Sequence, residues 1–185
     1  MLLVALVMLA LVPVLGGDVR RLSGLRLRWS WLVFVALAVQ VLVISLIPSM
    51  ARGWDAAAHV LTYVGALVVV GVNWRVPGLL AVGAGTALNG IAIAANGGTL
   101  PASQSALDAA GIHYPPSVFV NSGALAHPHL SWLGDRFVSP TFLPLHNVVS
   151  IGDLLILAGV AVLLVRVCGV TLRSVLRRPR PAPAS

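Results

Sequence analysis

Successive apolar runs, separated by short polar or glycine- and proline-containing segments, constrain the fold of this chain more than any other feature. The runs cover residues 1–16, 29–47, 56–72, 78–95 and 148–167. A helix needs about 20 apolar residues to cross ~30 Å of hydrocarbon. Hydrophobic residues make up 58% of the chain and charged residues 9%, a balance that excludes a soluble domain. We therefore predict an all-α integral membrane protein, a five-transmembrane-helix bundle forming a single membrane domain over residues 1–171.

The first run indicates a membrane helix rather than a removable signal peptide. No basic segment precedes it, and the sequence around residues 12–17 lacks a cleavage signal of small residues. Tryptophan residues fall at the predicted ends of several spans, where an amphipathic ring is favoured. They are Trp29, Trp31, Trp54 and Trp74.

The distribution of arginine predicts the orientation, because cytoplasmic loops carry an excess of basic residues. Two arginines, Arg52 and Arg136, lie in the loops of one side. The other side has ten: Arg20, Arg21, Arg26, Arg28, Arg75, Arg166, Arg173, Arg177, Arg178 and Arg180. We therefore predict a plasma (inner) membrane protein with its N-terminus outside and a disordered basic cytoplasmic tail over residues 172–185.

The loop over residues 97–146 is predicted to form an extended outer cap. Residues 102–110 have the pattern of a short surface helix, with a capping box from Ser105 to Asp108 and Gly111 as its end. The remainder is rich in proline and is expected to be extended and irregular.

Polar side chains within the spans gather toward the predicted outer face, and this convergence indicates a pocket there. Polar groups at membrane depth are costly and usually have a partner. The candidate binding residues are Asp55, His59, Asn89, Asn96, Asn147 and Ser150, and Asp153 follows in the same segment. Thr62 or Tyr63 continues the stripe of Asp55 and His59 along the third span.

Each of these residues also has a plain structural explanation. Ser150 and Asp153 match a capping box, in which the serine accepts a hydrogen bond from a backbone N–H and the acid reaches back to another. Asp55 also lies in a first helical turn. His59 fits an interior hydrogen-bonded histidine, and the asparagines fit interhelical hydrogen-bond partners.

Metal, cofactor and nucleic-acid functions are not expected. The single cysteine, Cys168, excludes a cysteine-built metal site, and four histidines in the outer loop have no accompanying cysteine or glutamate. The formal net charge of +7 is explained by topology, because the arginines flank spans. The expected partners are the lipid bilayer and either a lipid or a membrane-protein partner.

The fourth span, through its glycines and the alanines between them, has small residues at several three- and four-residue spacings. Gly78, Gly83, Gly85 and Gly90 would let neighbouring backbones approach closely, which promotes helix association in lipid. This pattern favours packing within the bundle, and a homodimer seam is the alternative.

Three motifs in this order resemble a family of small bacterial multi-pass membrane proteins of unknown function. They are Asn96-Gly-Gly-x-x-Pro101, Gly134-Asp135 and Pro144-x-x-Asn-Val-x-Ser-Ile-Gly-Asp153. The resemblance covers nearly the whole chain and implies a multi-pass membrane location. It implies no activity.

The chain also resembles, more weakly, the aspartyl lipoprotein signal peptidases. The matching residues are Asp135-Arg136 and Pro144-x-x-Asn147 leading to Asp153. This resemblance implies two catalytic carboxylates, Asp135 and Asp153, that share a proton, one as base and one as acid. The chain departs from that pattern because Asp135 lies far beyond the end of the fourth span and Asp153 follows the asparagine by six residues instead of three.

Three functions remain open from the sequence. The first is a binding or accessory protein with a polar pocket near the outer membrane face. The second is an intramembrane aspartyl hydrolase that uses Asp135 and Asp153 at the outer leaflet. The third is a subunit of a larger membrane complex, with a partner covering the small-residue face of the fourth span.

Overall fold

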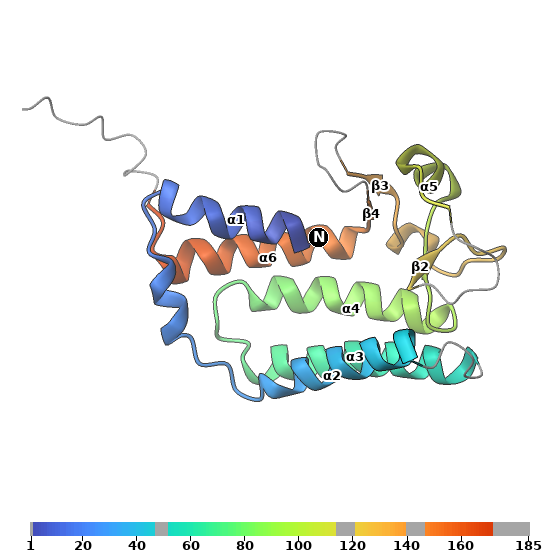
Figure 1. Cartoon of the computed structure of the whole chain (residues 1–185), viewed down its shortest axis with the longest axis horizontal. Coiled ribbons are helices and arrows are strands. Elements are labelled where there is room, and N and C mark those ends of the chain that lie inside the picture. The colour runs from blue at the N-terminus through green and yellow to red at the C-terminus, as the bar shows by residue number, and fades with distance from the viewer. Residues whose placement is uncertain (1, 47–51, 114–120, 140–146, 172–185) are drawn as a thin grey trace, which may run out of the picture.

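A computed structural model describes residues 2–46, 52–113, 121–139 and 147–171 of the chain. The fold is mainly helical, and a small group of short strands lies at one end of the helices (Figure 1). In chain order the elements are α1 (Leu2–Val14), η1 (Val19–Gly24), α2 (Trp31–Leu46), α3 (Arg52–Val72), α4 (Leu79–Ala95), β1 (Leu100–Pro101), α5 (Gln104–Ala110), β2 (Ser122–Gly123), η2 (Ser131–Leu133), β3 (Phe137–Val138), β4 (Val148–Val149) and α6 (Ile151–Cys168).

The long helices lie side by side in the order α1, α6, α4, α3 and α2 (Figure 1). Helix α4 is central, because it packs against α6 on one side and α3 on the other. Each of the five predicted apolar runs overlaps one of these helices, so the helical part of the prediction is confirmed, although α3 starts at Arg52, before the predicted residue 56, and α6 ends at Cys168. Within the described part of the chain, one helix, α6, is long and apolar enough to cross a membrane, while the apolar segments Leu2–Val14, Ala56–Val72 and Leu79–Ala95 are shorter.

Helices α4 and α6 meet through glycine. A Cβ atom on Gly85 would overlap the carbonyl oxygen of Gly152, and a Cβ on Gly159 would overlap the backbone around Gly78 and Val82. The contact therefore requires Gly85 of α4 and its N-cap residue Gly78, together with Gly152 and Gly159 of α6. The two other glycines of α4 face α3, with Gly83 against Val70 and Gly90 against Tyr63. These glycines are thus contacted from within the chain, as the packing interpretation predicted.

The cap is more ordered than the sequence suggested. Strand β1 pairs in parallel with β2, and β3 pairs antiparallel with β4. The last helix was predicted to begin near Val148. Residues 148–149 instead belong to β4, and the helix begins at Ile151. The difference arises because the Val148 backbone pairs with β3 and its side chain is buried against α5.

Helix α5 also differs from its prediction in how it begins. Its N-cap residue is Ser103, without a side-chain capping bond, and Ser105 instead lies within hydrogen-bond distance of Ser103. The predicted capping box from Ser105 to Asp108 is therefore wrong, whereas Gly111 ends the helix in the left-handed conformation as predicted. One face of α5 is buried within the cap, where Ala106, Leu107 and Ala110 cluster with Val148 of β4.

Candidate functional site

A cavity of ≈ 590 Å³ lies where the cap meets helices α2, α3, α4 and α6. Its polar lining comes from the cap and from the adjoining ends of the helices, and its apolar lining comes largely from α2 and α3. The lining residues that carry the argument below are Val33, Ala36, Leu37, His59, Tyr63, Asn89, Ser122, Asp135, Asn147 and Asp153. Segments far apart in the sequence therefore build one site.

The first turn of α6 presents Asp153 to this cavity. Ser150 caps the helix, since its Oγ accepts from the Asp153 N–H at 3.0 Å and its own N–H donates to Asp153 Oδ2 at 3.1 Å. Asn89 of α4 then donates to Asp153 Oδ1 at 3.0 Å and accepts from Ser150 Oγ at 2.8 Å. The predicted capping box is confirmed. Because Asn89 ties it to α4, the Asp153 carboxylate is held in a fixed position.

The cap places Asp135 at the same cavity by backbone hydrogen bonds. The Asp135 N–H donates to the carbonyl of Pro101 at 2.9 Å, and the Asp135 carbonyl accepts from the Ser103 N–H at 2.8 Å. This pairing needs glycine at position 134, because a Cβ there would overlap the Pro101 carbonyl oxygen. The Gly134-Asp135 motif is thus a close backbone approach followed by a positioned carboxylate.

The environment of the Asp135 carboxyl group is unusual. The residue is only 6% exposed, and Ser122 Oγ donates to its Oδ2 at 2.5 Å. Among the described residues, no group forms a hydrogen bond with its Oδ1 atom. Desolvation raises the pKa of Asp135 to about 7, the nearby charge of Asp153 adds to this increase, and the hydrogen bond from Ser122 opposes it. Burial therefore favours the protonated form of the Asp135 carboxyl group.

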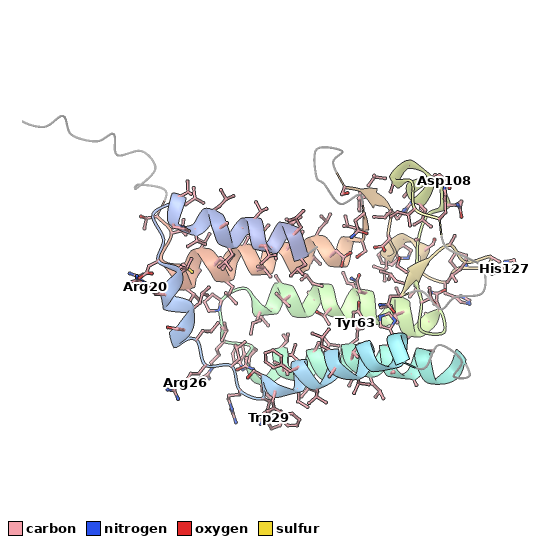
Figure 2. The ribbon with its side chains drawn as sticks, in the orientation of Figure 1. Arg20, Arg26, Trp29, Tyr63, Asp108 and His127 are labelled. Carbon is pink, nitrogen blue, oxygen red and sulfur yellow. The ribbon has the colours of Figure 1, made fainter. Side chains whose placement is uncertain are left out.

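The Asn96-Gly-Gly-x-x-Pro101 motif joins the cap to the helices. Gly98 packs against Ala56, and its carbonyl lies 2.5 Å from His59 Nδ1. Since a carbonyl only accepts, His59 Nδ1 carries the proton of this bond. The His59 ring in turn meets Tyr63 edge-on, with 5.5 Å between ring centroids. This arrangement forms the α3 wall of the cavity, and Figure 2 shows Tyr63 near the cap end of the bundle.

The structure brings most of the predicted site residues together. Asn147 lines the cavity with the residues described above, while Ser150 is fully buried behind Asn89 and Asp153. Asn96 does not belong to the lining, because its amide bonds the backbone of His129 at 2.7 and 2.8 Å and so holds the cap. The side chain of Asp55 lies outside the described part of the structure.

The sequence did not indicate Ser122, Asn121 or Thr86, which also line the cavity. The pairing of β2 with β1 brings Ser122 and Asn121 to the cavity. Each of these strands has only two residues, too few to show the alternating sequence pattern by which a strand is predicted. Thr86 follows Gly85 directly on α4, so only the rotation of that helix determines that it faces the cavity.

The charge of the lining is acidic in a basic protein. Asp135 and Asp153 carry its carboxyl groups, and none of the described residues that line the cavity is an arginine. Within the described ranges, no group of three or more histidine, cysteine, aspartate or glutamate side chains has the arrangement to hold a metal ion.

A family model matches residues 24–165, a range that contains all three motifs and every lining residue named above. The chain belongs to DUF5317, a family of unknown function. The predicted membership in a family of unknown function is thereby confirmed. No curated protein and no solved structure matches the sequence.

Proposed function

We propose that this DUF5317 protein is a multi-pass protein of the plasma membrane, with the cap and the N-terminus outside and the arginine-rich end in the cytoplasm. Large apolar side chains are exposed on the helices, including Leu2 at 75%, Phe34 at 70% and Leu61 at 65%. A soluble monomer rarely exposes apolar surface on this scale, whereas lipid would cover it. Arg20 and Arg26 lie at the end of the bundle opposite Asp108 and His127 (Figure 2), which fits the positive-inside rule.

Cysteine labelling tests this topology in a variant that lacks the single cysteine, Cys168. We expect a membrane-impermeant maleimide to label Ala109→Cys, on the exposed face of α5, in intact cells. Gly24→Cys, at the exposed arginine-rich end, is expected to react only after the cells are permeabilised. Equal labelling of both positions in intact cells would contradict the proposed orientation.

The function that we propose is binding of an amphiphilic molecule at the cavity beneath the cap. The observation that supports it is the division of the lining: Asp135, Asp153 and Asn89 at a polar end, and Val33, Ala36 and Leu37 of α2 along an apolar wall. A pocket with mostly apolar walls and a few placed polar groups is the usual form of a small-molecule site. In the proposed orientation its polar end lies near the outer headgroup region, so a lipid would fit with its head at the cap and its chain along α2.

Native mass spectrometry of the protein purified in a mild non-ionic detergent tests this proposal. We expect one bound amphiphile per protein, and loss of that species when Ala36→Trp fills the apolar wall. Leu2→Trp, on an exposed position of α1, serves as the matched control and should keep the ligand. Retention of the same amphiphile by Ala36→Trp would place it outside the cavity and refute the assignment.

A second candidate function, hydrolysis by an aspartate pair, is favoured by the position of Asp135 and Asp153 in one cavity. Their environments differ: Asp135 is a buried carboxyl with a pKa of about 7, and Asp153 is held by a capping box and by Asn89. Two carboxyl groups with unequal environments are a recurring acid–base arrangement.

In that function Asp153 would take a proton from a water molecule that adds to a carbonyl carbon of the substrate. Asp135, in its protonated form, would give its proton to the leaving group as the bond breaks. The substrate would be an ester or amide near the outer headgroups. Asp135→Asn and Asp153→Asn separate this function from binding: both abolish turnover in a hydrolase, whereas a binding protein with these substitutions shows altered affinity and no turnover in either form.

A further inference from the structure

The charged groups at the polar end of the cavity select the kind of head group that fits there. The chain has 12 basic and five acidic side chains. The two aspartates nevertheless provide the carboxyl groups of the lining, and the described lining contains no arginine. A phosphate or carboxylate head would meet carboxyl groups without a compensating cation, which is strongly unfavourable in a partly desolvated site.

Asp135 supplies an independent sign of a ligand. The side chain is nine-tenths or more buried and lines the cavity, and its Oδ1 atom has no hydrogen-bond partner among the described residues. A buried polar atom without a partner costs about 1–3 kcal/mol and needs an explanation, and a bound donor would satisfy it. Asp153 faces the same space with its carboxylate held in place by Asn89 and Ser150.

We propose that the cavity binds an amphiphile with a cationic amine head, whose ammonium group lies between the carboxyl groups of Asp135 and Asp153. This inference rests on the proposed binding function and specifies its ligand class. An ammonium group has three N–H donors and no acceptor, so it complements two carboxyl groups. The alkyl chain lies along Val33, Ala36 and Leu37. Tyr63 also lines the cavity, and an aromatic ring near the head would favour a cation.

A competition experiment by native mass spectrometry tests the ligand class. The protein in a non-ionic detergent is incubated with equal amounts of dodecylamine, dodecanol and dodecyl phosphate, which share one chain and differ in the head. We expect the amine to be retained about tenfold or more over the alcohol, the ratio that a charge-assisted hydrogen bond supplies. The phosphate should not be retained.

Variants assign this preference to the two carboxyl groups. Asp135→Asn and Asp153→Asn should each reduce the ratio of amine to alcohol, and the double variant should bring it to about one. Asp108→Asn, on the exposed face of α5, is the matched control and should leave the ratio unchanged. Thermal unfolding in the same detergent verifies that each variant is folded. If Asp153→Asn unfolds because the capping box of α6 is lost, Asp135→Asn alone provides the test.

Each outcome distinguishes the ligand class from the binding function. Equal retention of amine and alcohol, or preference for the phosphate, overturns the cationic head and leaves amphiphile binding standing. Retention of none of the three probes refutes amphiphile binding itself, and the ligand class with it. An amine preference that persists in the double variant places the cation elsewhere and also overturns this inference.

Discussion

Helix α4 builds two unlike regions with adjacent residues. On the side facing α6, Gly85 brings the two backbones into contact. Next to it on the same helix, Thr86 and Asn89 line an open cavity together with residues of α3 and the cap. The glycine contact between α4 and α6, called the seam below, leaves no space between the two backbones. The cavity, in contrast, leaves room for a ligand. Gly85 and Thr86 are consecutive in sequence, but successive residues of a helix point about 100° apart around its axis. One of them therefore packs against α6 and the other faces the cavity.

A closely packed contact between two apolar helices can fix the position of a polar group beside it. The seam depends on glycine, because only a close approach of the two backbones supplies these dispersion contacts. Asn89 lies between the two regions, since it touches Gly152 of the seam and hydrogen bonds Asp153 of the cavity. The seam thus positions the Asp153 carboxyl group through Asn89.

The largest effect is expected at the seam. Gly85→Ala places a Cβ on the carbonyl of Gly152, so we expect a loss of about 3 kcal/mol or complete failure to fold. Thermal unfolding in mild detergent measures it. Gly65→Ala on α3 is the matched control, since a Cβ there meets nothing within 4 Å and alanine favours a helix. Equal melting of Gly85→Ala and the wild type would show that the seam is looser than described.

The next effect concerns pH and Asp135. Its pKa rises from 3.8 in the unfolded chain to about 7 in the folded protein, so between these values the folded state binds more protons. Stability is therefore greatest at low pH and is lost as the pH rises toward 7. Relative to Asp135→Asn, we expect the wild type to gain about 2 kcal/mol between pH 7 and pH 5. Parallel melting profiles of the two proteins across this range would contradict the burial of a protonated carboxyl group.

A comparable effect is expected at the junction of the two regions. Asn89 is 1% exposed, and Asn89→Ala leaves Ser150 and Asp153 each without one partner. The expected cost is about 2 kcal/mol, measured by thermal unfolding. Asn121→Ala, at an exposed position of the cavity lining, should change stability much less. If both substitutions cost the same, the cavity and the seam are not coupled through Asn89.

The smallest effect separates two serine caps. Ser150→Ala removes the capping bond to the Asp153 N–H and the buried hydrogen bond to Asn89 Oδ1, and is expected to cost about 1–2 kcal/mol. Ser103→Ala, at the start of α5, removes no capping bond and should be nearly neutral. Thermal unfolding of both variants checks this difference, and equal losses would mean that the cap of α6 does not hold Asp153.

Local patterns were enough to predict the helices and one part of the site. Apolar runs predicted each long helix, because a helix that contacts other helices or lipid needs apolar side chains along its whole length. The capping box of Ser150 and Asp153 was predicted because it involves residues three apart on one turn. The box predicted at Ser105 was wrong because the backbone of Ser103 pairs with Asp135, which is distant in the sequence, and Ser103 rather than Ser105 is the N-cap residue of α5.

The sequence by itself determined that the chain forms apolar helices, that α6 begins with a fixed carboxylate, and that polar residues gather toward one end. These properties depend on composition, spacing and hydrogen bonds within one turn. Only the tertiary structure decided that Asp135 joins Asp153, that Asn96 holds the cap instead of lining the cavity, and that Gly152 and Gly159 receive the glycines of α4. The physical reason is that these contacts join residues far apart in the chain, and their partners are set by helix rotation and by strand pairs too short to leave a pattern.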